Sequence, residues 1–193
     1  MKNILLIDGS KKFLTSEGRL SKTLHNVAKE TLISLNKTVE ETIIDSEYDL
    51  EEEVLKILKA DAIIFQMPAW WMGIPWTVKK YIDTVYMQGY GRFFENDGRS
   101  SQDPSRKYGT GGLLKGKKYM ISVTWNAPIE AFEEKDNFFE GLGVDGVYFS
   151  FHKIQEFVGM NKLPSFMCND VIKNPNIELY IENYKNHLQK VFA

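Results

Sequence analysis

The sequence is poor in the residues that mark several classes of protein. Only one of its 193 residues is a cysteine, Cys168, which excludes an intrachain disulfide and a cysteine-rich metal site and suits a small buried side chain. No apolar run approaches the ~20 residues that span a bilayer. The net charge is only −2, without a basic excess or stripe, which argues against a nucleic-acid binder.

Histidine is also scarce. The three histidines, His25, His152 and His187, fall inside predicted helices without partners at metal-ligand spacing, so we expect no metal site. The amino terminus leads directly into a strand-like run, without the architecture of a signal peptide. We therefore expect a soluble, cytoplasmic protein without stable membrane insertion. At this length the chain is most simply one domain, residues 1–193.

Buried strands and amphipathic helices alternate along the chain. Short apolar or β-branched runs predict strands at 3–8, 38–44, 62–65, 118–124 and 164–169. Apolar residues at helical spacing predict helices at 20–35, after Asp49, from Pro75, and at 130–140, 149–160 and 175–192. We expect an α/β fold, a flavodoxin-like doubly wound five-stranded parallel sheet of order 2-1-3-4-5 with helices on both faces.

Three loops follow predicted strands and carry the functional signal. Residues 68–73 hold two adjacent tryptophans, Trp70 and Trp71, which are costly on a loop unless a flat ligand or a second subunit covers them. Residues 9–19 open a helix, whose free N–H groups and dipole suit a phosphate. Residues 124–128 add a hydroxyl, an amide and backbone donors. Because strands one, three and four neighbour one another in this fold, a phosphate site beside aromatic walls predicts a flavin nucleotide.

Two further segments have simpler interpretations. The acidic run Glu51–Glu53 predicts a solvated helix face. The polar stretch 89–117 is long for a loop in a compact domain, and its aromatic residues indicate that it packs on something.

Four segments resemble the modulator of drug activity B family. Residues 66–81 read Gln-Met-Pro-Ala-Trp-Trp-Met-Gly-Ile-Pro-Trp-Thr-Val-Lys-Lys-Tyr. Further family segments match residues 103–112, 122–132 and 143–148, the last with Phe151-His152-Lys153 after it. The likeness covers essentially the whole chain. It implies a flavodoxin-fold NADPH:quinone reductase, a homodimer that holds one FAD per site and takes hydride from NADPH. It also implies ping-pong kinetics, in which NADPH leaves before a quinone occupies the same pocket.

The resemblance also assigns residues. It implies FAD contacts at Ser16, Glu17, Gly18, Arg19, Leu20, Ser21, Lys22, Thr23, Ala69, Trp70, Trp71, Met72, Tyr108, Thr124, Trp125, Asn126 and Ala127. Among these, Trp70, Trp71 and Tyr108 would shape a slot for flat substrates. Mammalian quinone reductases carry a tyrosine–histidine pair after strand four, which residues 125–132 lack, so we assign no catalytic acid–base residue.

Other functions stay open from the sequence. A flavodoxin-type electron carrier would prefer FMN and a strongly acidic surface, which the small net charge does not favour. Related flavodoxin-fold proteins serve as ancillary subunits of potassium-efflux antiporters, so a regulatory subunit is a second alternative. Nitroaromatics and azo dyes fit a flat apolar slot as well as quinones do.

Overall fold

The computed structural model describes residues 1–14 and 16–193, so Thr15 of the predicted loop 9–19 lies outside the described residues. At its centre is a parallel sheet. Its strands are β1 (Asn3–Asp8), β2 (Thr38–Ile43), β3 (Ala62–Pro68), β4 (Lys118–Thr124), β5 (Asn161–Lys162) and β6 (Phe166–Cys168). The strand order is β2-β1-β3-β4-β5, and β6 also pairs in parallel with β4. The expected sheet and its order are confirmed, with two short strands sharing the fifth position.

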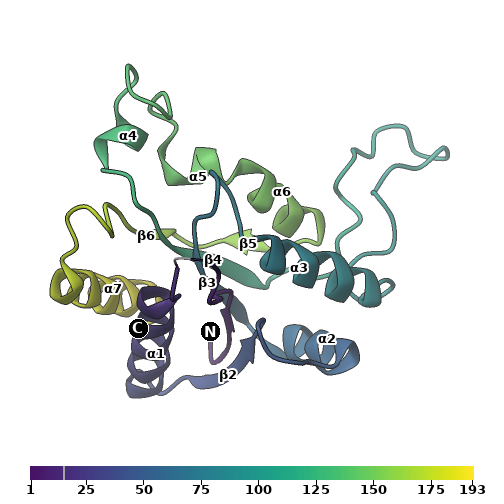
Figure 1. The fold of residues 1–193 in the computed structure, drawn as a ribbon. Helices are drawn as coiled ribbons and strands as arrows, with labels where there is room; N and C mark the ends of the chain where they lie inside the picture. Colours follow the sequence, from purple (N-terminus) through teal and green to yellow (C-terminus); the bar gives the residue numbers. More distant parts are fainter. Residues whose placement is uncertain (15) are drawn as a thin grey trace.

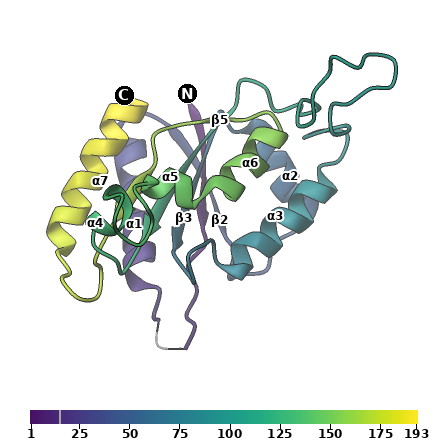
Figure 2. The same ribbon diagram turned by 90° about the horizontal axis from the view of Figure 1, so that it is seen from above.

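Helices cover both faces of the sheet (Figure 1, Figure 2). One face carries α1 (Arg19–Ser34) and α7 (Ile177–Phe192), and the other carries α2 (Leu50–Lys59), α3 (Trp76–Gln88) and α6 (Phe149–Phe157). Among the residues that the structure describes, no helix is both long and apolar enough to cross a membrane. Because helices cover both faces of the sheet, its strands have continuous apolar sequences rather than alternating ones.

Successive side chains of each strand enter two separate cores, because they point to opposite faces of the sheet. Ile4 and Leu6 of β1 pack in the core that contains α1 and α7. Leu5 and Ile7, between them in the sequence, pack in the core that contains α2, α3 and α6. All four side chains are at most 1% exposed.

The predicted helix 130–140 is wrong beyond its first turn. The helix there, α4, covers only Glu130–Glu133. The chain then folds back, so that Phe139 stacks on Phe132 with ring centroids 4.5 Å apart. Both rings also meet Trp125 edge to face. Burial of these three aromatic side chains outweighs the intrinsic preference of a short segment for helix.

Other predicted boundaries differ by a few residues. The predicted helix 149–160 ends at Phe157, because Gly159 takes a left-handed φ of 96° that stops the helix. The predicted helix start at Pro75 is the N-cap instead, and α3 begins at Trp76. A further short helix, α5, covers Gly143–Val147.

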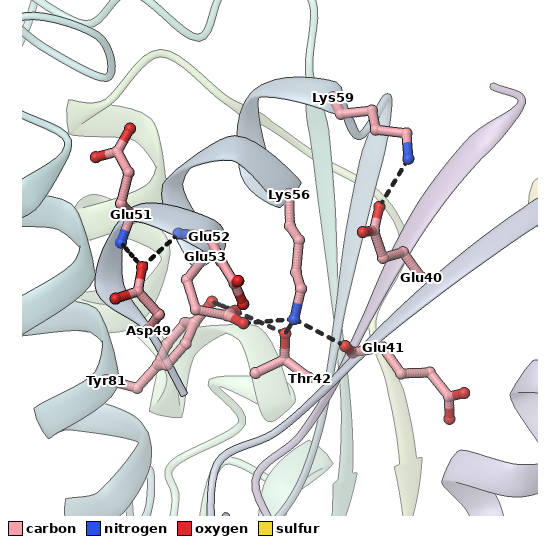
Figure 3. Close-up of polar contacts among 10 residues, drawn as sticks. All are labelled: Glu40, Glu41, Thr42, Asp49, Glu51, Glu52, Glu53, Lys56, Lys59 and Tyr81. Atoms are coloured by element: carbon pink, nitrogen blue, oxygen red, sulfur yellow. Dashed lines mark hydrogen bonds and ion pairs between the residues drawn. The ribbon is translucent and has the colours of Figure 1, made fainter. Parts of the chain in front are cut away.

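The acidic start of α2 is not the uniformly solvated face that the sequence predicts (Figure 3). Asp49 caps the helix as expected, since its carboxylate accepts backbone hydrogen bonds of 2.9 and 3.0 Å from the first turn. Glu53, however, is only 1% exposed. It accepts hydrogen bonds from the hydroxyls of Thr42 (2.6 Å) and Tyr81 (2.7 Å), and from Lys56 Nζ (2.5 Å). The buried carboxylate is thus satisfied, and it ties α2 to β2 and α3.

The long segment 89–117 runs out beyond α3 (Figure 1, Figure 2) but is anchored at its base. Phe93 is fully buried and meets Tyr86 edge to face, with centroids 5.6 Å apart. Gly112 lies so close to the end of α6 that a Cβ there would come within 2.3 Å of the Val158 carbonyl carbon. The segment therefore packs on the body of the protein, as its aromatic content predicts.

Candidate functional site

Three loops leave the carboxyl ends of β1, β3 and β4 and meet at one end of the sheet. Gly9 N donates to Gln66 O (2.8 Å), which joins the first loop to β3. Ala69 N donates to Thr124 O (2.9 Å), which joins the second loop to β4. The strand order reverses between β1 and β3, and open α/β sheets bind ligands outside the strand ends at such a point.

The first loop presents the amino end of α1. Gly18 is the N-cap with a left-handed φ of 65°, and no side chain of the described residues caps the helix. A Cβ at Gly18 would also lie only 3.3 Å from Lys11 O. Backbone N–H groups in the first turn of α1 are therefore available to an anion, and the helix dipole favours one. This arrangement fits the phosphate of a nucleotide.

Two hydroxyl side chains among the FAD contacts that the resemblance implies, Ser21 and Thr23, have other partners in the structure. Ser21 is only 2% exposed, and its Oγ lies 3.1 Å from Thr124 Oγ1. Thr23 Oγ1 donates to Arg19 O within the same helix (3.0 Å). The backbone, rather than these hydroxyls, thus offers the donors of the first loop.

The second loop is a tight turn in a strained conformation. Trp70 and Gly73 exchange backbone hydrogen bonds of 3.1 and 3.2 Å. Trp71 and Met72 between them have φ values of 45° and 60°, which bulky residues rarely adopt. The turn leaves Trp71 96% exposed, while Trp70 lies 5.2 Å from Phe13 between ring centroids. Strain of this kind is typical of ligand-binding turns.

The third loop differs from its predicted form, because the Trp125 side chain belongs to the core. Its indole is 7% exposed and is surrounded by aromatic rings, including Tyr148 at 5.7 Å. Asn126 Oδ1 accepts hydrogen bonds from the backbone of residues 172 and 173 (3.1 and 3.2 Å). The N–H groups of Asn126 and Ala127 donate to no acceptor in the described part of the chain. The loop therefore offers backbone donors rather than an aromatic wall.

A cavity of about 1090 Å³ lies beside the first two loops. We call it the main cavity. Four predicted site residues line it, namely Ser16, Ala69, Trp70 and Trp71. The outward face of α3 and the start of α6 form the remaining walls. Its volume is sufficient for a flat ring system together with a second aromatic molecule.

Tyr108 does not line the main cavity. It is 69% exposed and lies beside Phe157, with ring centroids 5.7 Å apart, in an adjoining cavity of about 580 Å³. Their walls are continuous, because the two cavities share Lys79, Asp83, Ser150 and Ile154. The residues predicted to bind substrate are therefore divided between two neighbouring cavities.

Several lining residues were not predicted. Phe13 and Leu14 of the first loop line the main cavity, as do Trp76, Lys80 and Thr84 of α3. A signal for the last three existed in the sequence. They recur every four residues on the polar side of a helix whose other side carries the apolar residues, and a tryptophan in such a position is unusual.

Cys168 and His152 carry potentially reactive groups, but both side chains pack within the fold. Cys168 is 1% exposed, as expected for a small core residue, and burial raises the pKa of its thiol to about 12. His152 Nδ1 lies 2.9 Å from the Tyr119 hydroxyl, and its Nε2 lies 3.2 Å from Asp145 Oδ1. His152 does not line the main cavity, whereas its neighbours Ser150 and Phe151 do.

Comparisons with known proteins agree with this architecture. A family model described as the flavodoxin-like fold matches residues 2–191. The chain is 57% identical over 191 residues to NADPH:quinone oxidoreductase MdaB of Haemophilus influenzae, which covers 99% of this chain and 100% of that protein.

Two solved structures illustrate the shared fold. A candidate quinone reductase from Klebsiella pneumoniae has a TM-score of 0.77 at 20% identity, covering 98% of this chain and 83% of that one. General stress protein 14 of Treponema denticola, in complex with FMN, has a TM-score of 0.67 at 17% identity, covering 98% and 99%. The family model and the full-length identity together show that the chain belongs to the flavodoxin-like fold family and, within it, to the modulator of drug activity B family that its motifs resemble.

Proposed function

We propose that the chain is a flavin-dependent NADPH:quinone oxidoreductase that reduces quinones to quinols by two electrons in the cytoplasm. The observation that carries this proposal is the main cavity, which lies between the loop that leads into α1 and the Trp70–Trp71 turn, at the carboxyl ends of β1 and β3. Its activity is the one that the name of the H. influenzae relative gives.

The described residues suit a flavin nucleotide along its length. The first turn of α1 would bind the phosphate, the Trp70–Gly73 turn would support the ring, and the N–H groups of Asn126 and Ala127 would face its polar edge. A bound flavin supplies the hydride-accepting and hydride-donating chemistry, and the protein positions it. Trp71 would then form one side of the slot that admits a flat substrate.

FAD is the form of flavin that we propose, from the resemblance to the family. FMN is the alternative, because the T. denticola protein of the same fold was solved with FMN. Heat release of the bound flavin, followed by mass spectrometry, distinguishes the two by the presence of the adenylate group. Recovery of FMN alone would contradict the proposal of FAD while leaving the reductase activity open.

A homodimer is the second structural part of the proposal. Large apolar side chains are exposed on α3, on the start of α6 and on the segment 89–117, including Met87 (65%), Tyr90 (63%), Tyr108 (69%) and Phe149 (61%). Exposure of this kind favours burial against another protein surface. Light scattering after gel filtration should give twice the mass of the chain, and a monomer at micromolar concentration would contradict it.

Steady-state kinetics test the activity itself. With added FAD, NADPH and menadione, both substrates varied, we expect FAD-dependent turnover and parallel double-reciprocal lines, because both substrates would use the main cavity in turn. Intersecting lines would replace the ping-pong scheme by a ternary complex. No turnover despite bound flavin would contradict the reductase proposal and favour an electron carrier or a regulatory subunit. Substituting a nitroaromatic or azo compound for menadione tests the remaining alternative.

A further inference from the structure

A second cavity, of about 570 Å³, lies beside the main cavity. We call it the side cavity. Trp76, Lys80 and Thr84 line both cavities. These residues are four apart in α3 and form one stripe on its surface. A ligand that occupies both cavities therefore has to cross this stripe.

The opposite wall of the side cavity is the segment 44–48, which directly follows β2, together with Lys11 of the first loop. Ile44 N donates to Asp8 O (3.0 Å), so this wall is fixed next to the end of β1. In dinucleotide-binding α/β folds an acidic side chain close behind the second strand accepts hydrogen bonds from the ribose hydroxyls of NAD, and a basic side chain nearby accommodates the 2′-phosphate of NADP. Asp45 has the place of the acidic side chain here, and Lys11, which forms an ion pair with it, is the basic side chain beside it.

The charges of the side cavity suit a phosphate ester. Lys11 forms an ion pair with Asp45, so the negative charge of this carboxylate is neutralised and does not repel a bound anion. Lys80 is exposed and forms no ion pair with any residue in the described ranges 1–14 and 16–193. Glu47 is exposed at the wall, where solvent screens it. Thr77 also lines the cavity, and its hydroxyl has no hydrogen-bond partner among the described residues.

Aromatic side chains supply a surface for a base. Trp76 is 55% exposed, and Tyr48 is half-buried on the facing wall, with its ring 5.4 Å from Tyr81. Purine bases stack readily on such rings. The side cavity thus combines an aromatic surface, a ribose acceptor and unpaired positive charge, which together match adenosine phosphate.

The relation of the two cavities identifies which adenosine phosphate fits. We propose that the side cavity binds the adenosine half of the dinucleotide hydride donor. The nicotinamide half would lie in the main cavity, and the pyrophosphate would cross the α3 stripe beside Lys80. The inference rests on the proposed function, since it assigns the remote half of the same donor. It predicts that donor affinity depends on residues outside the main cavity.

The test separates the adenosine half from the hydride-bearing half. ADP-ribose, which carries the first but no hydride, is titrated into the flavin-loaded protein by calorimetry. KM is measured for NADPH and for reduced nicotinamide mononucleotide, which lacks adenosine. The variants are Ser46→Trp, which fills the side cavity from an exposed position, and Lys80→Ala. Lys185→Ala is the matched control, an exposed lysine on α7.

We expect ADP-ribose to bind and to compete with NADPH. Lys80→Ala should weaken ADP-ribose about tenfold, the effect of losing one charged contact to phosphate. Ser46→Trp should weaken it at least as much and should raise KM for NADPH more than KM for the mononucleotide. Lys185→Ala should change neither. Should Ser46→Trp fail to fold, Lys11→Ala carries the same test, because Lys11 lines the side cavity but not the main cavity.

Other results overturn the inference. Equal ADP-ribose affinity in the wild type and both variants would do so, as would a failure of ADP-ribose to bind. If Ser46→Trp releases FAD but keeps its affinity for ADP-ribose, the side cavity holds the adenosine of the flavin instead, which also contradicts it. A protein that binds ADP-ribose as described but reduces no quinone refutes the proposed acceptor alone, so the two failures are distinguishable.

Discussion

The Ser21 hydroxyl lies 3.1 Å from the Thr124 hydroxyl, in a position where both side chains are buried. One residue belongs to the first turn of α1 and the other ends β4. The pair therefore connects the helix start that suits a phosphate with the loop whose free N–H groups suit a ring. Neither hydroxyl needs to touch a cofactor to influence how it is held.

Thr124→Val should lower the free energy of unfolding by about 1–3 kcal/mol, because it leaves Ser21 Oγ buried without a partner. The double variant with Ser21→Ala should cost less than the sum of the two single variants, since it removes both partners. Urea unfolding of the flavin-free protein measures all three. Thr23→Ala, whose hydroxyl bonds only within α1, is the control. Additive effects would contradict a direct contact.

Substitutions of two tryptophans of the predicted site should have different effects on stability. Trp71 is 96% exposed at a φ of 45°, so Trp71→Gly loses no buried surface and relieves a conformation that glycine adopts freely. Its unfolding free energy should stay within about 1 kcal/mol of the wild type, with a raised KM for quinone. Trp125→Ala should lower the unfolding free energy by about 3–5 kcal/mol, because the substitution leaves a cavity in the core. Similar losses in both variants would contradict these placements.

Asp145 should give the protein a pH-dependent contribution to stability. Burial raises the pKa of its carboxyl. Hydrogen bonds with His152, Lys162 and Ser165 lower the pKa by a larger amount, so that the net pKa is well below its usual range. A lowered folded-state pKa means that the contribution is complete above the unfolded-state pKa of about 3.9 and is lost as the pH falls towards the folded-state pKa.

Asp145→Asn should therefore reduce the unfolding free energy at pH 7. The loss should be about 1 kcal/mol, because the side chain is 41% exposed and solvent screens the interactions. The difference between variant and wild type should shrink below about pH 4. Chemical unfolding at pH 7, 5 and 3 measures it, and a difference that grows in acid would have the wrong sign.

The Cys168 thiol should be inert in the folded protein. Burial raises its pKa to about 12, so almost no thiolate is present at pH 8, and the side chain is only 1% exposed. Iodoacetamide should leave the native protein unmodified while alkylating one thiol per chain in urea, as counted by mass spectrometry. Rapid reaction of the native protein would show that β6 opens readily.

The elements predicted best are those whose signal is local. β1 spans Asn3–Asp8 as predicted, and the α/β class and strand order follow from alternating apolar runs and from the handedness of crossovers. The loops at the strand ends follow from the same regularities, so their convergence was predictable. The failed helix 130–140 depended instead on Phe139 returning to Phe132, a contact that helical spacing does not encode.

The fold class, the order of the sheet and the three loops at its carboxyl end follow from the amino-acid sequence, because they depend on the periodicity of apolar residues and on the handedness of crossovers. The packing of distant segments is needed to show that Trp71 faces solvent while Trp125 is buried, and that Tyr108 lies outside the main cavity. The same packing forms the side cavity, which combines residues from three separate segments. The exposure of a side chain depends on which distant segments pack against it, and the residue type alone does not indicate those segments.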